Sequence, residues 1–461
     1  MHLQGLQMLD SFLKKEPFRT MTISKFTSST DTVATLLNML ELTSEAGYRD
    51  IRLFAAKVLA ELAVSLRVAP IPGAMQEEEQ QVDHDFLPVL GMIILERLSS
   101  FDIENCTKIS KAGLVSTTIE FTSSRIVLEN INEAHHRLLK GSALKVLRRL
   151  ASIEGRFGVK LRHEISEHPF LLRNLAGILD DNGSCSQQLK ELAAEILRDL
   201  AMDGNTRQEI GHFQAIISRL VHAFLRRDVV PSVTDSDKSL QIIAGQALTV
   251  LSVESPSNCL AISAEAGYAF IKELTTMIHA DRYKYTAASL LQNMCLHAQS
   301  MLSKADLKEL SHILPEVLEG IMDEEGTKLE VLAGLGSQIC KVIPEDFAQE
   351  LERGQTKEIF IKGLISSLNA NMKPTACCPG VMRAIVELAV CMMECNPSYT
   401  ICFNKYQMLE ALLLVEQSLS RAENYRYFSD DVGLMEHTVP LSALVDRAKE
   451  MIGANNLYWG P

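Results

Sequence analysis

The stretch Ala143-Leu-Lys-Val-Leu147-Arg-Arg-Leu150-Ala151 carries the pattern that decides the fold. Its small and leucine residues fall at the spacing that places side chains on one face of an α-helix. The pattern returns clearly in residues 193–201 and in looser form along the chain. The first leucine-class residue of each copy lies at 59, 95, 147, 197, 248, 291, 332 and 385. Helical patterns with periods of about 40 to 50 residues are typical of solenoids with two or three helices per repeat.

Each repeat contains further helices after this phrase. Residues 190–202 predict one helix, and Asp203-Gly-Asn205 predicts a polar turn. A short helix over 207–210 follows, Gly211 is expected to bend it, and residues 215–225 form an amphipathic helix. Glycines at 113 and 267 precede similar apolar helices. The sequence therefore predicts an all-α chain whose repeats contain a polar turn and a glycine bend.

This order of helix, polar turn, glycine bend and apolar helix resembles the armadillo repeat, and the resemblance covers essentially the whole chain. It implies a right-handed armadillo/HEAT-like α-solenoid superhelix of about eight repeats that binds other proteins. More narrowly, residues 161–176, 203–211 and 341–345 are similar to a plant (grass) family of armadillo-type proteins, some described as brassinolide-enhanced. That family has no defined molecular activity, and its longer members carry additional N-terminal sequence with hydrophobic segments.

The residue just before the second leucine of each repeat is a candidate binding position. Importin-alpha and beta-catenin hold extended peptides with asparagines at this position, and importins add tryptophans. Here the only tryptophan is Trp459, and the positions are Glu61, Arg97, Arg149, Asp199, Val250, Asn293 and Glu387. One asparagine in seven excludes the peptide ladder of those proteins but leaves a mixed-charge row for a basic or amphipathic helix. We expect exposed, partner-binding side chains at Arg97, Arg149, Asp199, Asn293 and Glu387; the alternative is salt bridges between neighbouring repeats.

The domain prediction is one armadillo-type solenoid over residues 1–461. Residues 1–30 are interpreted as a partial N-terminal repeat, because Leu3, Leu6, Leu9 and Phe12 resemble the last helix of a repeat. Residues 440–453 form the predicted C-terminal capping helix. Three polar segments are predicted surface loops: an acidic loop at 75–85, a polar loop at 226–239 and a proline- and cysteine-containing loop at 369–379.

Composition sets limits on the class of protein. The net charge is −13, and where basic residues cluster they form only short groups such as pairs. Both features argue against nucleic-acid binding. Ten cysteines without a Cys-x-x-Cys motif favour a reducing compartment. No apolar run reaches the length of a membrane span, and no signal peptide is recognisable. The predicted location is cytoplasmic; nuclear location and membrane association of a longer form are alternatives.

The strongest hint of chemistry is His163-Glu-Ile-Ser-Glu-His168, which is close to a zinc-protease motif. Histidines five apart lie on different sides of a helix, and Pro169 ends it, so no metal site is predicted. Cys391 and Cys395 are interpreted as core residues, and Gly334-Leu-Gly336 as close helix packing. Cys377 and Cys378 lack a basic neighbour that would activate a thiol. No enzyme, cofactor or metal is expected.

These observations predict a non-catalytic scaffold that binds an unidentified protein partner along the concave face of the solenoid. The alternative is a membrane-associated or regulatory subunit of a larger assembly, truncated at its N-terminus.

Overall fold

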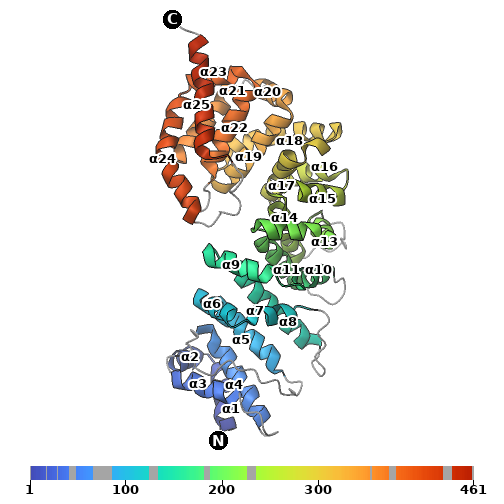
Figure 1. The fold of residues 1–461 in the computed structure, drawn as a ribbon, viewed down its shortest axis with the longest axis vertical. Coiled ribbons are helices and arrows are strands. Elements are labelled where there is room, and N and C mark those ends of the chain that lie inside the picture. The colour runs from blue at the N-terminus through green and yellow to red at the C-terminus, as the bar shows by residue number, and fades with distance from the viewer. Residues whose placement is uncertain are drawn as a thin grey trace. The chain divides into compact units, whose positions relative to one another are not determined.

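The computed structural model describes residues 2–16, 18–27, 30–40, 48–65, 86–123, 133–180, 187–225, 235–353, 356–372, 380–428 and 439–458. All regular structure in these ranges is helical, so the all-α prediction is confirmed (Figure 1). The chain divides into two compact units, Met1–Leu200 (unit 1) and Ala201–Pro461 (unit 2).

Unit 1 consists of short helices connected by turns and loops. Its elements are α1 His2–Leu13, α2 Phe18–Thr27, α3 Thr30–Leu40, α4 Tyr48–Leu62, η1 Ala63–Ser65, α5 Leu87–Phe101, α6 Ile103–Lys111, α7 Leu114–Glu120, α8 Glu133–Ala151, α9 Gly155–Ser166, α10 Leu171–Asp180 and α11 Gln187–Leu200. Helices α1, α4, α5, α8 and α11 pack in that order, each against the next. We call them the row helices of unit 1.

Unit 2 is built in the same way. Its elements are α12 Gly204–His212, α13 Gln214–Leu225, α14 Asp235–Ser252, α15 Pro256–Ala266, α16 Phe270–Ile278, α17 Lys284–His297, η2 Gln299–Met301, α18 Lys304–Asp323, α19 Gly326–Val342, α20 Pro344–Arg353, α21 Lys357–Ala370, α22 Val381–Cys395, α23 Pro397–Lys405, α24 Met408–Phe428 and α25 Leu441–Tyr458. Its row helices are α14, α17, α19, α22 and α25, which also pack in order.

The recurring phrase forms the core of the row helices. Leu147 and Leu150 in α8 and Leu197 and Leu200 in α11 have no exposed surface. Each fully buried leucine contributes about 1.5–3 kcal/mol relative to an exposed one. In the looser copy at residues 91–99, burial follows the pattern only in part: Gly91 of α5 is exposed, whereas Leu98 and Ser99 are buried.

The polar turn after a row helix begins the next helix. Asp203 is the N-cap of α12, and its Oδ1 accepts a hydrogen bond of 2.9 Å from the backbone N–H of Thr206. Asp102, Ser255 and Asn396 cap α6, α15 and α23 in the same way. Each cap satisfies a backbone N–H that has no partner inside its own helix.

A buried asparagine closes the other side of this turn. The side-chain amide of Asn105 donates to the carbonyl of Leu98 at 3.0 Å, and that of Asn258 donates to Leu251 at 2.9 Å. Both asparagines lie 7 residues beyond their acceptor, at equivalent places in two repeats. Carbonyls in the last turn of a helix lack an intrahelical partner, so a buried side-chain donor there removes a desolvation cost.

The glycines act in two different ways. Gly113 and Gly267 have φ of 71° and 84°, a backbone conformation that favours glycine, and they confirm the predicted bends. Gly211 does not bend the chain, because α12 continues to His212. It allows close packing instead: a Cβ at Gly211 would lie 1.8 Å from Oδ1 of Asn258. The prediction of a bend at Gly211 is therefore wrong.

Several boundaries between helices and loops differ from the predicted ones. Helix α14 begins at Asp235, inside the loop predicted for 226–239, and α21 continues to Ala370, inside the loop predicted for 369–379. Residues 371 and 372 follow α21 as a turn, while 226–234, 373–379 with Cys377 and Cys378, and the predicted loop 75–85 lie outside the described residues. The last helix, α25, extends beyond the predicted 440–453 to Tyr458.

We expect Gly211→Ala to destabilise the protein by about 1–3 kcal/mol, because the added methyl group overlaps the Asn258 side chain. Gly204→Ala in the same helix is the matched control, since a Cβ there meets nothing within 4 Å. Chemical denaturation of both variants measures the difference. Equal stability of the two variants would contradict the packing explanation.

Candidate functional site

The positions before the second leucine, which we call the ladder positions, all lie on row helices. In unit 1, α4, α5, α8 and α11 carry Glu61, Arg97, Arg149 and Asp199. In unit 2, α14, α17 and α22 carry Val250, Asn293 and Glu387. Among the described residues, the structure joins two of these side chains directly, Glu61 and Arg97.

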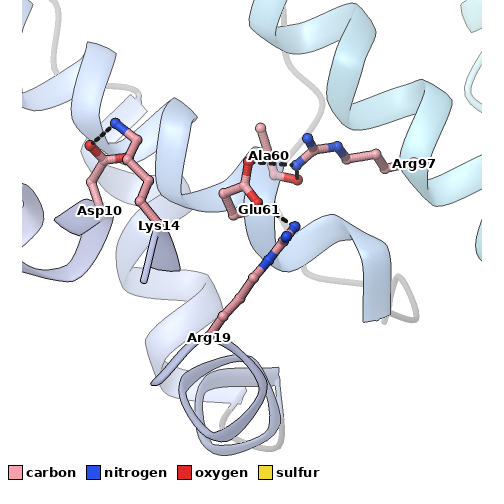
Figure 2. A network of polar contacts seen from close by, with 6 residues as sticks. All are labelled: Asp10, Lys14, Arg19, Ala60, Glu61 and Arg97. Carbon is pink, nitrogen blue, oxygen red and sulfur yellow. Dashed lines mark hydrogen bonds and ion pairs between the residues drawn. The ribbon is translucent and has the colours of Figure 1, made fainter. Parts of the chain in front are cut away.

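Figure 2 shows the contact between these two positions. The guanidinium of Arg97 lies 3.2 Å from Oε1 of Glu61 and also donates to the carbonyl of Ala60 in α4. Oε2 of Glu61 accepts from Arg19 of α2 at 2.9 Å. Arg97 thus connects two consecutive row helices, and Glu61 is shared between two arginines.

Arg149 and Asn293 make the same kind of contact. Nε of Arg149 donates to the carbonyl of Ser99 at 3.3 Å, and Nδ2 of Asn293 donates to the carbonyl of Thr249 at 3.2 Å. Each acceptor belongs to the last turn of the preceding row helix, where carbonyls lack a helical partner. The ladder side chains at Arg97, Arg149 and Asn293 therefore hold neighbouring repeats together.

Charged residues beside the ladder positions are also paired between row helices. Within the described residues, these pairs are Glu96 with Lys145 at 2.9 Å, Arg148 with Glu195 at 2.6 Å, and Lys341 with Glu387 at 3.4 Å. Partly exposed pairs of this kind contribute about 0–1 kcal/mol each. The mixed charge of the row is thus largely neutralised between adjacent helices.

Asp199 departs from the prediction of an exposed position. It is 8% exposed, its Oδ1 lies 2.9 Å from Arg198, and its buried Oδ2 has no hydrogen-bond partner among the described residues. Burial raises the pKa of this carboxyl, although Arg198, Arg148 and Arg162 favour its charged form. Its position on the buried side of α11 reflects the neighbouring helices, which the local pattern does not show.

In unit 2, the middle of one row helix, α19, exposes no surface to solvent. Every residue of α19 from Leu332 to Cys340 is buried, including the polar Ser337 and Gln338. A Cβ at Gly334 would lie 2.7 Å from Gln292 of α17, and one at Gly336 would lie 2.9 Å from Ile321 of α18. These glycines confirm the predicted close packing. Glu387, on the adjacent α22, thus lies beside a helix that offers little surface to a partner.

Exposed apolar side chains follow four ladder positions at a spacing of three or four residues, and one of them is Met202, 39% exposed, after Asp199. Val64 follows Glu61 and is 42% exposed, and Phe101 follows Arg97 and is 44% exposed. In unit 2, Leu296 follows Asn293 and is 47% exposed. Residues three or four apart in a helix share a face, so each lies beside its ladder residue. Sequence reasoning missed these residues, although an apolar residue at or just after the end of the recurring phrase is a usable signal.

The described residues offer little for metal chemistry, and two of the buried thiols are unreactive. They include no group of three or more His, Cys, Asp or Glu placed to hold a metal ion. Helix α9 ends at Ser166, before His168 and Pro169, in agreement with the predicted helix end. Burial raises the pKa values of the Cys259 and Cys295 thiols to about 12, which keeps both protonated at neutral pH. In the same ranges, no helix combines the length and apolar character required to cross a membrane.

Comparison with known proteins supports the fold. No family model matches the sequence, and no curated protein matches it. The structure described as "A conserved phosphorylation switch controls the interaction between cadherin and beta-catenin in vitro and in vivo" matches with a TM-score of 0.60 and 12% identity. The match covers 98% of this chain and 95% of that chain.

Two designed proteins match less well. The designed armadillo repeat proteins YIII(Dq)4CqI and YIII(Dq.V1)4CPAF, the latter in complex with peptide (KR)4, give TM-scores of 0.42 and 0.39, both at 12% identity. They cover 61% and 67% of this chain and 98% and 99% of their own. The fold assignment rests on the beta-catenin match: this chain has an armadillo-type all-α solenoid fold.

We expect Asp199→Asn to raise the melting temperature at pH 7, because the folded protein disfavours a charged carboxylate at this site. A carboxyl whose pKa is raised on folding contributes stability below its unfolded pKa, and this is lost as the pH rises through the folded pKa. The gain should therefore shrink as the pH falls below about 4, the ordinary Asp value. Asp50→Asn, at an exposed position in α4, should show no such gain. A lower melting temperature for Asp199→Asn at pH 7 would show that the ion pair with Arg198 outweighs burial.

Proposed function

We propose that this protein is a non-catalytic scaffold that binds a partner protein through exposed apolar side chains beside its ladder positions. The observation that carries this proposal is the repeated exposure of an apolar residue one turn beyond a ladder residue: Val64 and Phe101 in unit 1 and Leu296 in unit 2. A single exposed apolar residue is common on any surface, whereas here exposed apolar residues recur at equivalent places, at the ends of α4, α5 and α17.

The contacts in unit 1 separate structural residues from candidate binding residues. Arg97 and Arg149 are already bonded to the preceding row helix, and Glu61 is held by two arginines. Breaking these contacts to bind a partner would remove a donor from the helix-terminal carbonyls of Ala60 and Ser99. Val64 and Phe101 expose apolar surface, so covering them removes that surface from water.

The chemistry of this surface favours a partner segment with apolar side chains and few charges at the point of contact. Burying apolar residues surrounded by polar ones is typical of binding sites in which a few residues supply most of the affinity. In this proposal, Arg97, Arg149 and Asn293 position the row helices, and the neighbouring apolar residues contact the partner. Direct partner contacts by Arg97, Arg149, Asp199, Asn293 and Glu387 stay a prediction from the sequence.

Other finer predictions also remain proposals. These are the similarity to the grass armadillo-type family, the cytoplasmic location and the alternative of a membrane-associated or regulatory subunit. The matching beta-catenin structure supports a protein-binding scaffold through its fold, while the identity of the partner must come from experiment.

We expect Phe101→Asp and Val64→Asp to weaken partner binding about tenfold or more, because a charge would replace a buried contact. Partners are first identified by affinity purification of the full chain followed by quantitative mass spectrometry. The purified partner is then titrated against each variant by calorimetry.

Phe170→Asp is the matched control, since Phe170 is 55% exposed in the same unit but lies before α10, away from the ladder positions. Circular dichroism and melting curves establish that each variant is folded. A partner that binds Phe101→Asp and Val64→Asp as well as the unchanged protein would overturn the proposed surface. The absence of any stoichiometric protein partner would argue against the scaffold itself.

A further inference from the structure

Two cysteines on adjacent row helices of unit 2 lie very close together. The sulfurs of Cys340 in α19 and Cys395 in α22 are 3.7 Å apart, although the residues are 55 apart in sequence. The thiol of Cys395 also lies 3.4 Å from the carbonyl oxygen of Cys340. Both thiols are free. Helices α19 and α22 pack directly against each other, so the two sulfurs face one another across a repeat boundary.

The two thiols differ in their access to solvent. Cys340 has no exposed surface, whereas Cys395, the last residue of α22, is half-buried. A small reagent can therefore reach Cys395 first, and Cys340 is the nearest second sulfur. This arrangement of one accessible and one sheltered thiol is typical of an attacking and a resolving cysteine.

Neighbouring side chains distinguish this pair from the other cysteines nearby. Cys391, one turn before Cys395, is 2% exposed and its sulfur lies 3.1 Å from Oγ of Ser337. The hydroxyl of Tyr399 is buried and has no hydrogen-bond partner among the described residues. Burial raises the pKa of this hydroxyl.

We propose that Cys340 and Cys395 form an oxidation site, at which a small peroxide converts the two thiols into a disulfide that joins α19 to α22. In the first step, the Cys395 thiolate attacks one peroxide oxygen and the O–O bond breaks, which gives a sulfenic acid and a hydroxide; the hydroxide takes up the proton lost by the thiol and forms water. In the second step, the Cys340 sulfur attacks the Cys395 sulfur and the S–O bond breaks, so that a second water leaves. Overall, two thiols and one hydrogen peroxide give one disulfide and two waters.

The geometry requires only a small movement. A disulfide bond is about 2.05 Å long, so the sulfurs must approach by less than 2 Å. Cys395 ends its helix and is followed by the turn to α23, which gives its backbone room to adjust. Burial raises the pKa of the Cys340 thiol, so the second step should be slow at neutral pH and faster in mildly alkaline solution.

The test uses the purified full-length chain, treated with hydrogen peroxide or kept reduced, then alkylated under denaturing conditions and digested with trypsin. Cleavage after Lys328, Lys341, Arg383 and Lys405 places Cys340 in residues 329–341 and Cys395 in residues 384–405. Peroxide should produce a cross-link between these peptides that reducing agent removes. Fragmentation assigns the second sulfur, since residues 384–405 also contain Cys391 and Cys402.

Matched variants complete the experiment. Cys395→Ser and Cys340→Ala should each abolish the cross-link, while Cys391→Ala, on the same helix as Cys395, should retain it. Peroxide should raise the melting temperature of the unchanged chain and of Cys391→Ala, but not of Cys395→Ser, because the disulfide restricts the unfolded chain. Over-oxidation of Cys395 without a cross-link, or a cross-link from Cys395 to Cys402, would overturn the proposal.

Discussion

The structure depends on supplying hydrogen-bond donors to the carbonyls at the C-terminal ends of its row helices. The last turns of α5 and α14 contain buried residues, Leu98 and Leu251, whose carbonyls lack a partner within the helix. Asn105 and Asn258 supply donors from the following helix of the same repeat, and Arg97, Arg149 and Asn293 supply them from the next row helix. An unsatisfied buried carbonyl costs about 1–3 kcal/mol, so these contacts define which repeats can stack.

This requirement for hydrogen-bond donors also changes the role of the ladder side chains. In the armadillo proteins that bind extended peptides, the asparagine at this position serves the ligand. Here Asn293 donates to Thr249 and to the hydroxyl of Ser252, so even the single asparagine serves the neighbouring helix. The side chains of Arg97, Arg149 and Asn293 hold neighbouring repeats together, and in the proposed function the apolar residues beside them contact the partner.

Sequence reasoning could predict the features that depend on local periodicity. The recurring phrase identifies the buried leucines of the row helices because helical spacing alone places them on one face. The bends at Gly113 and Gly267 follow from their local conformation. Features that depend on residues distant in sequence could not be predicted. Gly211 is required because Asn258 packs against it, and Asp199 is buried by the packing around α11. Sequence reasoning placed the ladder positions on the row helices, but their contacts could not be predicted, because the partners of these side chains come from other repeats.

The complete burial of the middle of α19 affects how unit 2 unfolds. In a regular solenoid each repeat contacts only its neighbours and exposes one side of each helix, so repeats can open one at a time. Helix α19 contacts α17, α18, α20 and α22, which belong to its own and adjacent repeats, but it has no exposed face between Leu332 and Cys340. Its amides can exchange with solvent only when several helices separate together. We therefore expect this part of the solenoid to open as one cooperative unit.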